Sequence, residues 1–123
     1  MGAEVAVHAR NNANFTLLGF ADVTVLERTL GRGRWVVLGR VTMINLDSDQ
    51  QPATAKLVYD INATIDVYSF WPYEVFRGCV ALQGVVDLKN EATVVALQCN
   101  TYKGQAEYAS LVAFPVDTLD PPV

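Results

Sequence analysis

Three oxygen-bearing side chains alternate in the segment NLDSDQQPATA, at Asn45, Asp47 and Asp49. This spacing is how the calcium loop of an EF-hand begins. That loop also needs Gly at its sixth position and Glu at its twelfth, where this chain has Gln50 and Lys56. An EF-hand is therefore excluded. Two interpretations stay open: calcium held by Asp47 and Asp49 with backbone carbonyls, or a polar turn whose side chains bond their own backbone. We expect the turn.

A second candidate site is the aromatic segment SFWPYEVF, residues 69–76, whose Pro72 interrupts any β ladder. Exposed aromatic rings stack on sugars or anchor protein interfaces. The alternative is a loop folded over the open end of a sandwich, with its rings filling the core. If the chain has a ligand site, we predict it here, formed by Phe70, Trp71, Tyr73 and Glu74.

Residues for catalysis are few. His8 is the single histidine, so one chain cannot build a His-based metal cluster. Cys79 and Cys99 have no base placed beside them by the sequence, and no Ser lies in a nucleophile elbow. Paired carboxylates contributed by separate loops stay open. We predict that the protein is not an enzyme.

The charge pattern excludes two classes of partner. Nine basic residues are scattered through a chain of net charge −4, whereas a nucleic-acid surface needs a concentrated basic patch. No apolar run is long enough to cross a membrane, and the first residues lack the pattern of a signal peptide. We expect neither nucleic acid nor membrane as a partner. The compartment stays open between cytoplasmic and surface-assembled.

Short β-branched and aromatic runs, separated by Gly, Asn, Asp and Pro, recur along the chain without any helical repeat. This pattern is typical of a β-sandwich or barrel. A chain of 123 residues can bury its own core, so we predict one all-β domain over residues 1–123. The strands are expected near residues 4–9, 15–18, 22–30, 34–44, 54–60, 62–70, 78–88, 93–101 and 108–117.

The clearest alternation lies in GCVALQGVVDL and TVVALQCNT, which are joined by KNEA. Placing both apolar faces on one core pairs Leu88 with Thr93 as a hairpin. Cys99 then points inward and Cys79 outward, which is incompatible with a disulfide, so we predict two free thiols. The inward residues are Val80, Leu82, Val86, Leu88, Val95, Leu97 and Cys99.

Two other strands, RWVVLGRVTMI and YASLVAFPV, carry apolar residues on both faces. A sandwich buries only the inner face of each sheet, so a neighbouring subunit is expected to cover the outer one. Tolerated surface apolar residues are the alternative. The residues expected to need both core and subunit contacts are Trp35, Val36, Leu38, Leu111 and Phe114.

The stretches GRWVVLGRVTMINLDSDQQPATAKL, VVALQCNTYKG and LVAFPVDTL are spread over roughly two-thirds of the chain. Together they resemble the C1q/TNF-like jelly roll, and more narrowly the small bacterial domains of that type. The resemblance implies a jelly-roll β-sandwich of about 8–10 strands. It also implies a homotrimer packed through flat outer sheet faces, with ligand binding by loops at one end. Calcium occurs in some related folds.

We therefore expect a non-enzymatic, trimeric module for binding or assembly, such as a surface or fibre head. The alternative is a carbohydrate-binding, lectin-like module that uses the 69–76 loop. Calcium at Asp47 and Asp49 would be the one cofactor. The expected partners are further copies of the chain and a glycan or protein ligand.

Overall fold

The computed structural model describes residues 6–60 and 63–116 and has nine strands in this part of the chain. Each predicted strand has a counterpart, and those at 15–18 and 93–101 match to the residue. The described residues include no helix that is long and apolar enough to span a membrane. The strands are β1 Val7–Asn11, β2 Phe15–Leu18, β3 Val23–Leu30, β4 Gly33–Asn45, β5 Ala53–Tyr59, β6 Ala63–Phe70, β7 Arg77–Leu88, β8 Thr93–Thr101 and β9 Lys103–Pro115.

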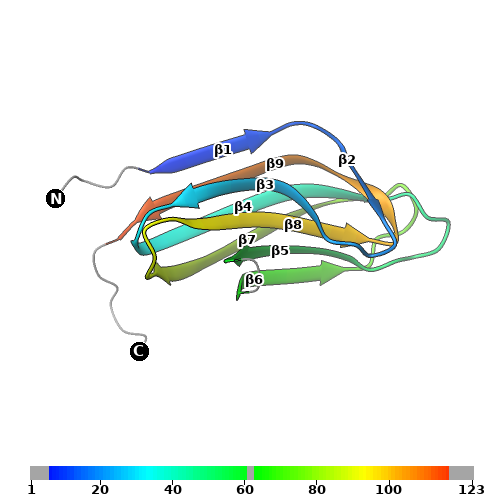
Figure 1. Cartoon of the computed structure of the whole chain (residues 1–123). Helices are drawn as coiled ribbons and strands as arrows, with labels where there is room; N and C mark the ends of the chain where they lie inside the picture. Colours follow the sequence, from blue (N-terminus) through cyan, green and yellow to red (C-terminus); the bar gives the residue numbers. More distant parts are fainter. Residues whose placement is uncertain (1–5, 61–62, 117–123) are drawn as a thin grey trace, which may run out of the picture.

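The strands form two antiparallel sheets that pack face to face (Figure 1). Sheet A has the order β1–β9–β4–β7, and β2 also pairs with β9; sheet B has the order β3–β8–β5–β6. β1 lies along residues 109–113 of β9 and β2 along residues 103–106, so both occupy one position in the sheet. The result is two layers of four positions each, which is the jelly-roll arrangement. The predicted fold class is confirmed.

The core lies between the inner faces of the two sheets. All seven residues predicted to face inward from β7 and β8 are buried. Trp35 is only 2% exposed, and its indole nitrogen donates a 3.0 Å hydrogen bond to the carbonyl oxygen of Gly31. Each aliphatic side chain buried in this way contributes about 1.5–3 kcal/mol of transfer free energy.

The predicted hairpin between β7 and β8 is wrong. β7 belongs to sheet A, where Leu88 lies opposite Gly33, and β8 belongs to sheet B, where Thr93 lies opposite Leu30. Residues 89–92 therefore cross from one sheet to the other. Alternation predicts which side chains of a strand face the core, but it does not identify the neighbouring strand.

The prediction of two free cysteines is confirmed although the hairpin is wrong. The cysteine prediction depended only on which face of its strand each residue occupies. Cys79 is exposed, Cys99 is buried, and both are free. Burial, with a smaller contribution from the negative charge of Asp22, raises the pKa of the Cys99 thiol to about 12. Of these two thiols, only Cys79 is therefore open to reagents at neutral pH.

Two predicted strand limits also change. β9 begins at Lys103 rather than near residue 108, and the chain bends only at Tyr102 between β8 and β9. Gly104 is needed for a close approach, because a Cβ at this position would meet the backbone carbonyl oxygen of Ile44. The strand expected at 4–9 is observed as β1, Val7–Asn11; residues 1–5 lie outside the described residues.

Candidate functional site

Two loops that are distant in sequence lie together at one end of the sandwich. Residues 46–52 connect β4 to β5, and residues 71–76 connect β6 to β7. Both lie at the end opposite to the start of β1 and the finish of β9 (Figure 1). The metal and ligand candidates of the sequence analysis thus fall in or beside these two segments, which we call the end loops.

Asn45 joins the two end loops and is fully buried. Its side-chain Nδ2 donates to the carbonyl oxygens of Asp49 and Pro72, both at 2.9 Å. Its own carbonyl oxygen accepts a 2.7 Å bond from the backbone N–H of Val75. One side chain at the end of β4 therefore fixes the position of one loop against the other.

Most hydrogen-bonded polar side chains of the first end loop bond within the loop, whereas Gln50 Nε2 donates to the carbonyl oxygen of Trp71 at 2.6 Å. Asn45 Oδ1 accepts from the N–H of Asp47 at 2.9 Å, and Asp47 Oδ2 accepts from the N–H of Asp49 at 3.2 Å. Gln51 also donates to Asp47 Oδ2, at 3.0 Å. These contacts form the polar turn that we expected. Among the described residues, no three His, Cys, Asp or Glu side chains are grouped as metal ligands. Calcium binding by Asp47 and Asp49 stays a prediction.

The rings of the second end loop are mostly exposed. Trp71 and Tyr73 are 58% and 66% exposed, and Phe76 is 62% exposed. Only Phe70 packs against the core, so the interpretation in which the rings fill the core holds for that residue alone. Glu74 is exposed beside them. Three rings and a carboxylate therefore lie on a loop that is tied to buried Asn45.

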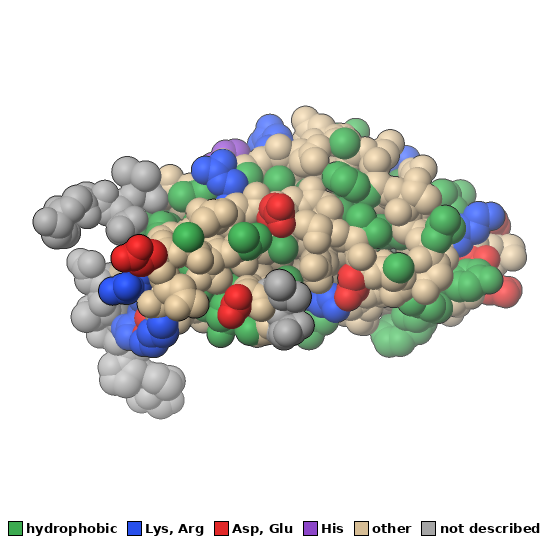
Figure 2. Space-filling view, viewed as in Figure 1, with side chains coloured by type: hydrophobic (Ala, Val, Ile, Leu, Met, Phe, Trp, Pro, Cys, Tyr) green, Lys and Arg blue, Asp and Glu red, His purple; other side chains and the backbone are tan. Residues whose placement is uncertain are grey.

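Further apolar side chains extend this end of the molecule. Phe20 and Tyr102 are 45% and 48% exposed, and their ring centroids lie 5.8 Å apart. Figure 2 shows hydrophobic side chains gathered towards the same end. Val75 is 70% exposed and has φ 54°, a left-handed conformation that is strained for a β-branched residue. Its N–H bond to Asn45 helps to hold it there.

The outer face of sheet A carries an apolar patch. Val85, Val36 and Phe114 lie opposite one another on β7, β4 and β9, and Leu38 and Val112 form the next row. We call these five residues the sheet A patch. Val85 is 48% exposed, and Leu38 and Phe114 are 38% and 37% exposed. Three neighbouring strands therefore present a continuous half-exposed apolar surface.

This geometry corrects part of the list of expected subunit contacts. Trp35 and Leu111 face the core and are buried within the single chain, so their burial needs no neighbour. Val36, Leu38 and Phe114 do face outward. Val85 was not among the predicted subunit contacts, although the adjacent pair Val85–Val86 in an otherwise alternating strand was an available signal.

The outer face of sheet B is different, because its polar side chains are hydrogen-bonded to one another. Lys56 and Asn100 both contact the carboxylate of Asp22 at 2.7 Å. Burial tends to raise the pKa of Asp22, but these two partners outweigh it and the pKa lies below its usual value. Figure 2 shows scattered charged and hydrophobic side chains over β3, β8 and β5, among backbone and other side chains. Further pairs are Thr54 with Ser69 and Gln98 with Thr24.

No protein-family model matches the chain, and no curated protein matches it. Its fold is similar to that of solved viral particles of infectious bursal disease virus. The T13 viral particle matches with a TM-score of 0.59 and 11% identity over 92% of this chain. The VP2 subviral particle gives 0.57 and 11% over 92%, and the Gx strain gives 0.56 and 10% over 91%.

The chain spans only about a third of the length of those viral chains, 32% and 33% in the first two. At such low identities the likeness shows the fold alone. It supports the jelly-roll sandwich that the strand order defines. The narrower C1q/TNF-like resemblance and a bacterial origin stay predictions.

Proposed function

We propose that this domain is a non-enzymatic assembly module whose copies pack through the sheet A patch. The observation that carries the proposal is the contrast between the two outer faces. The face of sheet A exposes apolar side chains on three adjacent strands, whereas sheet B carries bonded polar pairs and its exposed Val94 and Val67 lie on β8 and β6, separated by β5. Exposed contiguous apolar patches mark interaction surfaces. The viral particles that share the fold are themselves assemblies, which supports this role.

The stoichiometry we propose is the trimer implied by the C1q/TNF-like resemblance. In a trimer the patch of one copy contacts a different surface of the next copy, because a three-fold axis makes heterologous interfaces. Contact of the patch with itself gives a two-fold dimer instead. Sedimentation equilibrium at micromolar concentration separates these states, since the single chain has a mass of 13.5 kDa. A species of about three times that mass is expected.

The surface is tested by matched charge substitutions on two edge strands. Val85 on β7 is 48% exposed in sheet A, and Val67 on β6 is 52% exposed in sheet B. We expect Val85→Lys to produce a folded monomer and Val67→Lys to leave the oligomer intact, with melting temperatures confirming that both variants fold. A wild-type protein that sediments as a 13.5 kDa species overturns the proposal. Dissociation by both variants would refute the choice of sheet A.

A second candidate function is carbohydrate binding at the end loops. The observation that favours it is the exposure of Trp71 and Tyr73 on a loop that Asn45 ties to a buried support. Aromatic faces of this kind stack on sugar rings. Glu74 would add a polar contact, and calcium at Asp47 and Asp49 would add hydroxyl ligation.

Tryptophan fluorescence tests this second function directly, because Trp35 is buried and Trp71 is exposed. Binding of oligosaccharides from a defined panel should change the emission of Trp71, and Trp71→Ala should abolish the change without lowering the melting temperature. Tyr108→Ala is the matched control, since Tyr108 is 60% exposed on β9 rather than on the end loops. The idea fails if no sugar changes the emission, either with added calcium or with chelator.

A further inference from the structure

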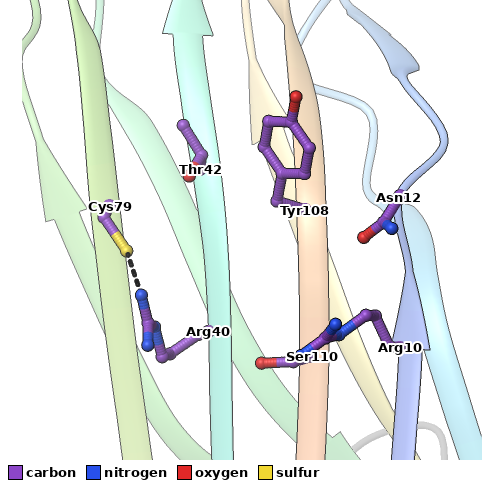
Figure 3. Close-up of a pocket in the computed structure, with 7 residues that line it drawn as sticks. All are labelled: Arg10, Asn12, Arg40, Thr42, Cys79, Tyr108 and Ser110. Atoms are coloured by element: carbon purple, nitrogen blue, oxygen red, sulfur yellow. Dashed lines mark hydrogen bonds between the residues drawn. The ribbon is translucent and has the colours of Figure 1, made fainter.

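A polar hollow of about 340 Å³ lies on the outer face of sheet A, farther along the strands than the apolar patch (Figure 3). Four strands contribute to it. Ser110 on β9 lies directly opposite Arg10 on β1 on one side and Arg40 on β4 on the other. The sheet register therefore places an arginine residue on either side of one serine. The remaining lining residues are Asn12, Thr42, Cys79 and Tyr108.

The two arginines carry positive charge that no described carboxylate balances. The ion pairs of the described residues involve neither Arg10 nor Arg40. Two acids on this face already have cations: Glu107 pairs with Arg77, and Asp87 pairs with Arg34 and Lys89. Two uncompensated guanidiniums thus share one hollow in a chain whose net charge is −4.

Arg40 has only a weak partner in this hollow. Its Nη2 lies 3.8 Å from the sulfur of Cys79, and sulfur is a poor hydrogen-bond acceptor (Figure 3). The side chain of Arg10 extends over Ser110. An anion that enters the hollow would therefore replace a weak contact rather than a strong ion pair.

A β-bulge adds a phenol to the rim of the hollow. The register between β4 and β9 shifts between Arg40 and Thr42, and Tyr108 has φ 55°. This left-handed conformation costs about 1–2 kcal/mol for a residue other than Gly. A bulge of this kind re-aims a side chain, and Tyr108 stands 60% exposed beside the hollow. The neutral donors beside the arginines are the hydroxyls of Thr42 and Ser110, since the hydroxyl of Tyr108 points away from Arg10 and Arg40 (Figure 3).

We propose that this hollow binds a tetrahedral oxyanion of the phosphate class. Arg10 and Arg40 supply the charge, since guanidinium groups bind phosphate oxygens in bidentate fashion. The hydroxyls of Thr42 and Ser110 donate to the remaining oxygens. A single hollow with two arginines suits one phosphate group and not the continuous phosphate backbone of a nucleic acid. The phosphate is either free or a monoester carried by another molecule.

Cys79 provides the measurement, because it lines the hollow while Cys99 is buried. The rate of alkylation of Cys79 by neutral iodoacetamide is measured against increasing inorganic phosphate at constant pH and ionic strength. We expect a saturable, several-fold slowing that Arg10→Gln abolishes. Arg10 lies on β1 and Cys79 on β7, with β9 and β4 between them, so loss of protection in this variant reports on the anion. Arg28→Gln, which changes an exposed arginine on β3, is the matched control and should keep the protection.

Two further comparisons complete the experiment. Cys79 is alkylated with anionic iodoacetate and with neutral iodoacetamide, and the ratio of the two rates does not depend on the reactivity of the thiol itself. This ratio should fall several-fold in Arg10→Gln and in Arg40→Gln. O-phosphoethanolamine separates the sources: protection by it assigns the hollow to a phosphate carried by another molecule, and protection by free phosphate alone assigns it to the ion. The same alkylation series is repeated in the Val85→Lys background, in which we expect a monomer. The result then does not depend on assembly. Phosphate that gives no saturable protection, or protects Arg10→Gln as well as the wild type, overturns the proposal.

Discussion

Replacing Asn45 should loosen the end loops and lower the stability of the whole domain. The Asn45→Ala variant loses three side-chain hydrogen bonds, to Asp49, Pro72 and Asp47. Each neutral bond contributes about 1 kcal/mol, and a buried group left without a partner costs about 1–3 kcal/mol. Water can replace the bonds to the two aspartates near the surface, but not easily the one to buried Pro72. We therefore expect Asn45→Ala to lower the free energy of unfolding by about 2–3 kcal/mol.

The loss converts into a measurable shift in melting temperature. A chain of 123 residues unfolds with an entropy of about 2.1 cal/mol/K per residue, so the midpoint should fall by about 8–12 °C. The assay is thermal and urea unfolding at one fixed protein concentration in a Trp71→Phe background, where buried Trp35 reports on the core. Asn100→Ala is the control, because its side chain makes one hydrogen bond on the outer face of sheet B.

The isosteric variant Asn45→Asp sharpens the test. Its carboxylate would face two carbonyl oxygens that now accept from Nδ2, so without calcium it should be less stable than Asn45→Ala. If the first end loop holds calcium, added calcium should restore the stability of Asn45→Asp. The reasoning is refuted if Asn45→Asp equals the wild type without calcium, or if Asn45→Ala loses less than about 1 kcal/mol.

Three other predictions concern strain, packing and charge. Val75→Gly should raise stability by about 0.5–1 kcal/mol in urea unfolding, because relief of the left-handed strain exceeds the added backbone entropy; a loss would contradict it. Gly104→Ala should lower the free energy of unfolding by about 2–3 kcal/mol, because the new Cβ forces β4 away from β9. Gly31→Ala, whose Cβ would lie 3.7 Å from its nearest neighbour, should lower it by less than about 1 kcal/mol. Asp22→Asn should cost no more than about 1 kcal/mol at neutral pH. Because the folded pKa of Asp22 is lowered, its contribution is present above the usual value of 3.8 and disappears as the pH falls through the folded value. Melting curves of Asp22→Asn and the wild type should therefore converge in acid.

Much of the fold follows from alternation alone. Val80, Leu82 and Val95 were assigned to the core because each lies in phase with other apolar residues, and all are buried. The partner of β7 could not be inferred in this way. A short loop after Leu88 suits a hairpin and also suits a crossing between two sheets, and only the packing of both layers decides between them.

The start of β9 was missed for a related reason. Gly104 after Lys103 looks like a turn in sequence, but this glycine allows two strands to approach closely. The sequence analysis identified both end loops as separate candidates. It could not show that they meet, because Asn45 contacts Pro72 across 27 residues of chain. The exposure of Trp71 also depends on how the loop folds, so the residues next to it in the sequence do not predict it.

The position of β9 has a consequence for how the chain is made. β9 is the last of the described strands to be synthesised, yet it lies between β1 and β4 in sheet A. While a ribosome is still translating it, sheet B can pair fully, but β1 and β2 lack their sheet partner and β4 keeps an open edge. Unpaired edges recruit other chains, and incomplete domains aggregate during synthesis. A nascent chain that stalls before its final strand would display that open edge beside Val36 and Leu38, the residues with which finished copies are proposed to join.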